Sequence, residues 1–228
     1  MTADPHAHDD HDHPHDHDHD HHHDHDHPPH PYQADHDETP SRYRVMEVAV
    51  RELLIEKGII SAEDVRRAIE AMDARTPAQG ARVIARAWTD AEYKTRLLEN
   101  GSAAVTELGI DVGPTHLVVL ENQPNLHNVV VCTLCSCYPR MVLGPPPSWY
   151  KSHSYRSRTV REPRAVLREF GTELPHGVEV RVHDSTADMR YLVLPLRPAG
   201  TDGWSEERLT TLVTRDSMIG VARANDPS

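Results

Sequence analysis

The sequence predicts an α+β fold in which an N-terminal helical arm precedes a layered α-β-β-α core domain. Apolar residues recur at helical spacing over 42–113, whereas short β-branched or apolar runs separated by helical segments follow from Thr115 onward. Strands and helices do not alternate regularly in that second part, which argues against a doubly wound sheet. We therefore expect a disordered tail over 1–41, the arm over 42–113 and the core over 114–228.

The tail is set apart by its composition. Residues 1–36 hold 14 of the 19 histidines, and the first 38 residues hold 11 Asp, one Glu and neither Lys nor Arg. The tail thus accounts for the formal charge of −12, because the 24 acidic residues beyond it are balanced by 24 basic ones. With so little apolar surface to offset the cost of ordering, it is expected to be disordered. It is a solvated extension, an expression tag or a loose metal-gathering segment, since His/Asp alternation offers many weak ligands.

The rest of the composition excludes several classes of protein. A neutral body with an acidic tail lacks the basic footprint that nucleic-acid binding requires. No run of 18 apolar residues exists, which argues against a transmembrane helix. The N-terminus shows neither the basic region nor the apolar region of a secretory signal. The 3 cysteines lie within six residues, which is not a disulfide framework. We expect a cytoplasmic protein that binds neither nucleic acid nor a membrane.

Helix boundaries are marked in the predicted arm. Gly58 is expected to end the first helix, and Ser61, Thr76 before Pro77, and Thr89 or Asp90 are expected to begin the next three. Short helices with few central apolar residues favour either an arm on another subunit or a small subdomain packed on its own chain. In the core we expect strands at His116–Leu120, Asn128–Val131, Val178–Val182 and Tyr191–Leu196, and helices over Arg161–Glu169 and from Ser205 to Val213.

The cysteines form a C-x-x-C-x-C cluster where a predicted strand enters a polar turn, and we predict a metal-binding loop over 131–140. Cys132, Cys135 and Cys137 bring three thiolates together, with the peptide nitrogens of Ser136 and Cys137 between them. Five such donors suit a six-coordinate or square-based metal with one open position better than structural zinc.

Other interpretations of the cluster remain open at this point. The cysteines could be small buried residues, a redox pair with an unexplained third thiol, or a zinc or copper site with His127 as the fourth ligand. An iron–sulfur cluster would need a fourth thiolate, which the chain lacks.

The segment VCTLCSCYP, residues 131–139, resembles the metal-binding loop of the nitrile hydratase α-subunit family. The resemblance runs, in order, over roughly residues 42–222. It is carried further by Ala81–Trp88, Asp90–Leu97, His127–Val129, Leu143–Gly144, Trp149–Lys151, Tyr155–Arg158, Arg161–Arg164, Arg181–Asp184, Arg197–Thr201, Gly203–Trp204 and Val213–Val221.

The resemblance implies a non-corrin Co(III) site, because Thr133 matches the cobalt branch of the family and the iron branch usually has Ser there. By similarity, Cys132 is the axial thiolate, and the amide nitrogens of Ser136 and Cys137 complete the equatorial plane. Cys135 would be oxidised to a sulfinic acid and Cys137 to a sulfenic acid, both still ligating the metal. The catalytic residues implied are thus Cys137, Cys135 and Ser136, with no further cofactor site.

The implied activity is that of a lyase of nitrile metabolism, a hydro-lyase that hydrates a nitrile to its amide. The trivalent metal acts as a Lewis acid, and either the Cys137 sulfenate or a metal-bound hydroxide is the nucleophile. In the family the α-subunit is active only with a β-subunit, or with separate β and γ chains. A heterodimer or heterotetramer and a cobalt-loading activator protein are therefore implied, with the arm 42–113 wrapping the partner.

One residue departs from the family pattern, because Arg140 follows Tyr138-Pro139 where most α-subunits have Trp. We expect Arg140 and Tyr138 in the substrate pocket, while a surface ion pair would equally explain the arginine. The γ-subunit of cobalt-containing thiocyanate hydrolase has Arg there and can carry a His/Asp-rich N-terminus. Conversion of thiocyanate to carbonyl sulfide and ammonia is thus the first alternative. A His-rich metal-binding or delivery protein is an alternative of another class.

Residues around the loop carry smaller expectations. His127 is expected to be structural or to support the site or a subunit contact, and Trp149 and Tyr150 are expected to pack against the loop. Arg156, Arg158, Arg161 and Arg164 form a basic run for which we expect salt bridges or subunit contacts.

Overall fold

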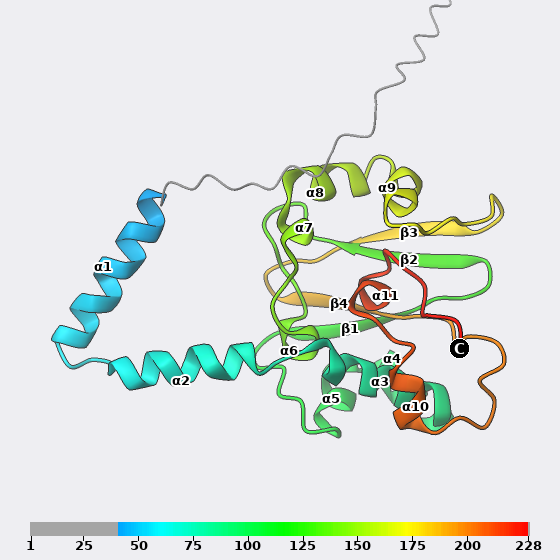
Figure 1. Cartoon of the computed structure of the whole chain (residues 1–228), viewed down its shortest axis with the longest axis horizontal. Helices are drawn as coiled ribbons and strands as arrows, with labels where there is room; N and C mark the ends of the chain where they lie inside the picture. The colour runs from blue at the N-terminus through cyan, green and yellow to red at the C-terminus, as the bar shows by residue number, and fades with distance from the viewer. Residues whose placement is uncertain (1–40, 228) are drawn as a thin grey trace, which may run out of the picture. The chain divides into compact units, whose positions relative to one another are not determined.

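Four short strands form two parallel two-stranded sheets, with helices on both sides of them (Figure 1). The computed structural model describes residues 41–227, so the predictions for the tail lie outside the described residues. The elements are α1 (Arg42–Glu56), α2 (Ala62–Asp73), α3 (Pro77–Thr89), α4 (Ala91–Glu99), α5 (Gly101–Thr106), β1 (His116–Glu121), β2 (Leu126–Val131), α6 (Arg140–Leu143), α7 (Ser148–Lys151), α8 (His153–Thr159), α9 (Pro163–Glu169), β3 (Glu179–Asp184), β4 (Met189–Leu194), α10 (Glu206–Thr210) and α11 (Arg215–Ile219).

Helices cover the strands in layers. Helix α8 packs on β2 and α9 on β3, whereas α4 and α5 pack on β1 (Figure 1). Strands β2 and β4 contact each other, so the two sheets share one core. This arrangement confirms the predicted α+β class with helices on either side of the strands. None of the described helices is both long and apolar enough to cross a membrane.

The strands pair across long stretches of sequence. Strand β1 pairs with β4 and β2 with β3, and both pairs are parallel. The register sets Val131, the last residue of β2, opposite Asp184, the last residue of β3. Because parallel strands end at the same edge of a sheet, the chain that leaves β2 starts beside Asp184.

Strand β2 lies at the centre of the core. Five of its 6 residues are buried, and its carbonyl at Asn128 is approached closely by the turn that ends α11. That turn contains Gly220 with φ of 87°, and a Cβ atom there would lie 2.0 Å from the Asn128 oxygen. A glycine is therefore required both by the left-handed conformation and by the close approach of the two backbones.

Several predicted helix starts are confirmed. Ser61, Asp90 and Ser205 cap α2, α4 and α10 with their side chains, and Thr76 precedes α3, which has Pro77 at its first position. Asp90, and not Thr89, is the cap of α4 because its carboxylate accepts from the backbone N–H of Tyr93.

Some boundaries differ from the prediction. The strand predicted over Tyr191–Leu196 is Met189–Leu194, and Pro195 follows it, since proline has no N–H for the ladder. The predicted helix Arg161–Glu169 begins two residues later, at Pro163, which suits the first position of a helix. The helix after Ser205 ends at Thr210, before Leu212 and Val213. Helices α6, α7, α8 and α11 have no counterpart among the predicted elements.

The region predicted as an arm, 42–113, contains two kinds of helix. Helices α3 to α5 bury large apolar side chains in the same core as the strands, including Ile84, Tyr93, Leu97 and Val105. Helices α1 and α2 bury no residue. Within the predicted arm, the part with an unburied apolar surface is thus 42–73.

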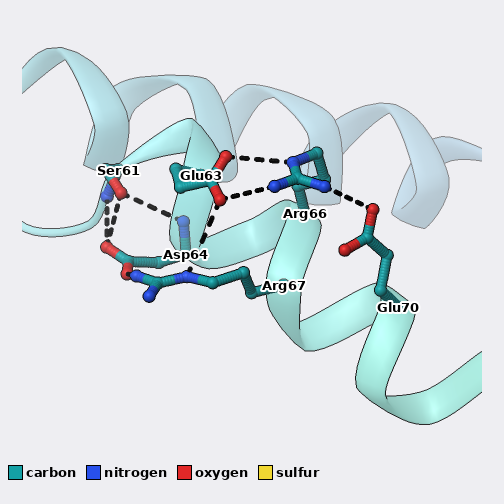
Figure 2. A network of polar contacts seen from close by, with 6 residues as sticks. All are labelled: Ser61, Glu63, Asp64, Arg66, Arg67 and Glu70. Carbon is teal, nitrogen blue, oxygen red and sulfur yellow. Dashed lines mark hydrogen bonds and ion pairs between the residues drawn. The ribbon is translucent and has the colours of Figure 1, made fainter. Parts of the chain in front are cut away.

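Helix α2 is instead organised by polar contacts with its own neighbours (Figure 2). Ser61 and Asp64 form a capping box, and the Asp64 carboxylate also bonds to Arg67. Arg66 bridges Glu63 and Glu70 at 2.5 Å each. These pairs lie three or four residues apart, which is the spacing at which side chains on one helix face each other.

Candidate metal centre

The cysteine cluster lies in the segment that joins the end of β2 to the start of α6. All three cysteines are free thiols; Cys132 is buried, Cys135 is exposed and Cys137 is half-buried. Cys132 directly follows the buried strand, so the core holds the first residue of the loop while the rest reaches the surface. A site on a surface loop next to a rigid strand is open to small molecules while its base stays fixed.

The three sulfurs face one another. Cys132 Sγ lies 3.5 Å from Cys135 Sγ, which in turn lies 3.2 Å from Cys137 Sγ. Potential ligand atoms of all three residues lie within 4.8 Å of one another. The backbone N–H of Cys135 also donates to Cys132 Sγ at 3.3 Å. The turn therefore gathers the thiols around a common point.

These distances fit a metal with ligands at right angles. Two sulfurs about 2.3 Å from one metal ion would be about 3.3 Å apart at 90° and about 3.8 Å apart in a tetrahedron. The observed separations of 3.5 and 3.2 Å are nearer the first value. The donor set thus suits octahedral or square-based coordination, such as that of a trivalent cobalt or iron, better than tetrahedral zinc.

The thiols differ in acidity. The pKa of Cys135 is lowered, mainly by a hydrogen bond with the Cys137 side chain and also by the backbone N–H groups of Ser136 and Cys137. Burial and the contact with Cys135 raise the pKa of Cys137 to about 12. The cluster thus lowers the pKa of its exposed thiol and raises the pKa of the half-buried neighbour.

Asp184 holds the first half of the loop. Its carboxylate accepts the backbone N–H of Thr133 at 2.9 Å and the Thr133 hydroxyl at 2.5 Å. This contact follows from the register of β2 and β3, which sets Asp184 beside the residue before Cys132. Sequence reasoning did not assign a role to Asp184; an acidic residue two positions beyond a predicted strand was the available signal.

Two side chains bind carbonyl groups in the second half of the loop. The hydroxyl of Tyr150 donates to the Cys137 carbonyl oxygen at 2.8 Å. The guanidinium of Arg156 donates to the Cys135 carbonyl oxygen at 2.5 Å. Tyr150 therefore contacts the loop, as expected. Arg156 binds the loop, whereas salt bridges or subunit contacts were expected for the basic run; of its four arginines, Arg158 forms salt bridges with Glu162 and Glu169.

The two predicted pocket residues lie in different surroundings. Tyr138 is buried, and its ring packs edge-on against Tyr150 with centroids 4.9 Å apart. Burial raises the pKa of Tyr138 well above its ordinary value, and its hydroxyl has no hydrogen-bond partner among residues 41–227. Arg140 is exposed at the first position of α6. Arg140 is thus the member of this pair that is open to the surroundings of the loop.

His127 lies at the other end of β2 and belongs to a buried polar network. Its Nε2 is 2.7 Å from the Gly220 carbonyl oxygen, and its Nδ1 is 3.3 Å from the Asn122 amide nitrogen. Cys132 lies five positions further along the strand, or about 16 Å away at the usual rise. His127 is not placed to be a fourth metal ligand, and the structural interpretation of this residue is correct.

Two hollows among the described residues lie away from the cysteines. One of about 300 Å³ adjoins His127, Arg197 and Arg223, and one of about 750 Å³ lies between α3 and the segment from α10 to α11. No cysteine lines either of them. The cysteine loop is thus not part of these hollows.

Comparison with known proteins agrees with the geometry. Residues 41–222 match the family described as nitrile hydratase, alpha chain. The chain is 53% identical over 179 residues to the cobalt-containing nitrile hydratase subunit alpha of Pseudonocardia thermophila, covering 77% of this chain and 88% of that one. It is 50% identical over 197 residues to the thiocyanate hydrolase subunit gamma of Thiobacillus thioparus, covering 81% of each.

A solved structure extends the likeness to the fold. A double mutant of the Fe-type nitrile hydratase of Comamonas testosteroni Ni1 superposes with a TM-score of 0.75 at 45% identity, covering 82% of this chain and 94% of that chain. The match spans nearly all the described residues, includes the cysteine loop and agrees with the layered core. The chain belongs to the nitrile hydratase alpha-chain family.

Proposed function

We propose that the chain is the metal-bearing α-subunit of a cobalt-type nitrile hydratase, which hydrates a nitrile to the corresponding amide. The observation that carries this proposal is the C-x-x-C-x-C loop, whose sulfurs gather within 4.8 Å at separations suited to a six-coordinate metal. The cobalt-containing relative at 53% identity supports the choice of this family activity.

In this proposal the metal ligands are the sulfurs of Cys132, Cys135 and Cys137 and the amide nitrogens of Ser136 and Cys137. A bound Co(III) would supply a Lewis acid that polarises the nitrile. Cobalt is preferred to iron because Thr133 stands in the loop, although an Fe-type enzyme has the same fold. The burial of Cys132 at the end of β2 supports its role as a fixed ligand, and the exposure of Cys135 leaves that thiol accessible to a metal.

Two of the cysteines are proposed to be modified. Cys135 and Cys137 reach the surface, where oxidation to a sulfinic and a sulfenic acid is sterically open. The Cys137 sulfenate oxygen would attack the nitrile carbon while the nitrile nitrogen takes up a proton, and water would then restore the sulfenate as the amide leaves; a metal-bound hydroxide is the competing nucleophile. Intact mass of the active protein under anaerobic conditions should then show about three added oxygens, and unmodified cysteines in active protein would exclude this step.

A β-subunit is proposed to complete the site, in a heterodimer or heterotetramer. The loop is open, and Leu134 at its tip is 88% exposed. Helices α1 and α2 and the turn between them expose apolar side chains that a partner would cover, including Tyr43, Met46, Ile59 and Ile69. Removal of residues 41–75 should abolish assembly with the partner while leaving the core folded; intact assembly would exclude the arm as the main contact.

The decisive test is an assay of the full chain co-purified with its partner. Aliphatic nitriles, aromatic nitriles and thiocyanate should be offered to the same preparation, with cobalt content measured in parallel. Turnover of nitriles supports the proposal, and turnover of thiocyanate alone would overturn it. The proposed location is the cytoplasm, and an activator protein that loads cobalt should raise the cobalt content.

Thiocyanate hydrolysis is the second candidate, and Arg140 favours it. Its guanidinium is exposed and makes no hydrogen bond or ion pair with another described residue, so it is available to an anion. Replacement Arg140→Trp should raise the rate on apolar nitriles relative to thiocyanate if the side chain lines the pocket. An unchanged ratio would assign Arg140 to the surface.

A metal-binding or delivery protein is the candidate of another class. It predicts a labile divalent ion that chelators remove, whereas the enzyme predicts inert cobalt. The 14 histidines of the first 36 residues would serve either role as a metal-gathering tail. Deletion of residues 1–38 should lower cobalt content at limiting metal if the tail gathers cobalt, and should leave it unchanged if the tail is a solvated extension.

A further inference from the structure

The contact between Arg156 and the cysteine loop joins two parts of the chain that are 21 residues apart. Arg156 lies on α8, and its Nη1 donates to the carbonyl oxygen of Cys135 at 2.5 Å. The side chain makes no ion pair with a described residue, and its Nε is buried without a hydrogen-bond partner there. The Cys135 carbonyl is therefore the polar partner of Arg156 in the described part of the chain. No ion pair with a described carboxylate holds the arginine side chain in this place.

The bonded carbonyl belongs to the peptide that contains the nitrogen of Ser136. Because a peptide unit is planar, a bond that fixes its oxygen also fixes the direction of its N–H. Tyr150 fixes the Cys137 carbonyl in the same way at 2.8 Å. The peptide between Ser136 and Cys137 thus lies between two restrained planes.

Helix α8 is itself fixed to the strand that leads into the loop. The hydroxyl of Tyr155, next to Arg156, donates to the Val130 carbonyl oxygen of β2 at 2.7 Å. Ser152 caps the start of the helix, and Arg158 ties its end to Glu162 and Glu169. Tyr155 therefore bonds to β2, which leads into the loop, and the adjacent Arg156 bonds to the loop itself.

We propose that Arg156 is a positioning residue that sets the conformation of residues 132–137 before any metal binds. The inference rests on the proposed function, because it assumes that the loop holds a metal. With the bond in place, the three sulfurs and the amide nitrogens stay on one side of the turn. Without it, the peptide after Cys135 rotates, and metal binding must first reorder the loop.

The experiment uses the full chain with its partner, stripped of metal and titrated anaerobically with Co²⁺. Arg156→Gln should weaken Co²⁺ binding by about 10- to 100-fold, as loss of a residue that orients metal ligands commonly does. Arg156→Lys, which keeps one donor, should recover part of the affinity. Tyr150→Phe, which removes one hydroxyl, should have a smaller effect in the same direction.

The matched control is Arg158→Gln on the same helix, which loses two ion pairs but does not touch the loop. It should lower the melting temperature and leave Co²⁺ affinity unchanged. A direct readout is alkylation of the metal-free protein, because Cys132 is buried and should react faster in Arg156→Gln than in the wild type or in Arg158→Gln.

The outcomes separate the two ideas. If the wild-type complex fails to bind Co²⁺, the proposed function is wrong. If the wild type binds but Arg156→Gln binds equally well, Arg156 does not position the loop. Equal losses of affinity in Arg156→Gln and Arg158→Gln would mean that α8 contributes only general stability, which also overturns the inference.

Discussion

Helix α2 and the cysteine loop are both surface segments, but different contacts hold them. The polar contacts of α2 join residues three or four positions apart, from the Ser61 cap to Glu70 (Figure 2). The loop is held by Tyr150, Arg156 and Asp184, which lie 13, 21 and 51 residues from their loop partners. One segment is organised by its own sequence and the other by the tertiary structure.

The difference suits the two proposed roles. Exposed ion pairs and a cap add little stability, so α2 is a formed helix whose apolar side chains remain available to a partner. The loop must keep three sulfurs within 4.8 Å, and contacts from β3, α7 and α8 prevent it from relaxing into the conformations open to a short free turn. Changes in the core should therefore reach the metal site and leave α2 unaffected.

The largest expected effect is the loss of a ligand. Cys137→Ala should lose retained cobalt and all measurable turnover, because no other described thiol can replace the sulfur. Leu196→Ala, which changes an exposed apolar residue outside the loop, is the control and should retain both. Cobalt analysis and nitrile assays measure this. If Cys137→Ala retained its full cobalt content, the cysteine loop would not be the metal site.

A smaller effect is expected at Asp184, where the loop depends on a residue of another strand. Asp184→Ala leaves two donors of Thr133 without their acceptor and should lower the free energy of unfolding by about 1 kcal/mol. Activity should also fall, by about tenfold, through weaker metal binding. Asp188→Ala removes a nearby exposed carboxylate as a control. Equal behaviour of the two variants would show that the loop does not need β3.

The two regions should also respond to pH in different windows. Burial lowers the pKa of His127 below 6.5, so the unfolded state binds more protons and core stability should fall as pH drops below about 6.5. In α2, hydrogen bonds with Ser61 lower the pKa of Asp64 from 3.8, so its contribution is present above about 3.8 and is lost only below that. Between pH 8 and 5, the free energy of unfolding should depend less steeply on pH in His127→Gln than in the wild type. The helical signal of α2 in circular dichroism should not change in that range. An unaltered slope would assign the effect to another group, such as His183.

The smallest expected effect is in α2. Ser61→Ala removes a side chain that accepts from the Asp64 N–H at 3.0 Å and should speed amide exchange in α2 by about fivefold without changing the melting temperature. Ser205→Ala removes the same kind of cap from α10, which buries Leu209, and should lower the melting temperature. If Ser61→Ala lowered it too, α2 would be coupled to the core.

The local features of this chain could be predicted from its sequence. Capping residues marked the starts of α2, α4 and α10 because a cap bonds to a backbone only two or three residues away, and Pro77 at the first helical position marked the start of α3. The spacing of Cys132, Cys135 and Cys137 gathers three sulfurs in one turn for the same reason. The strands were found from apolar runs, with errors of about two residues at ends that proline and pairing decide.

Helices α6, α7, α8 and α11 were missed because each is short and lacks a clear apolar period. Salt bridges or subunit contacts were expected for Arg156 because an arginine in a basic run looks the same whether its partner is a carboxylate or a distant carbonyl. Its role appears only when α8 packs on β2 and brings it to the loop.

The sequence by itself determined the class of fold, the metal-binding turn and the family, since each depends on residues that are near one another or match as a series. Only the tertiary structure decided that the strands pair in parallel, that α3 to α5 belong to the core and that Asp184, Tyr150 and Arg156 hold the loop. Those contacts join residues far apart in the chain, and packing, not local preference, selects them.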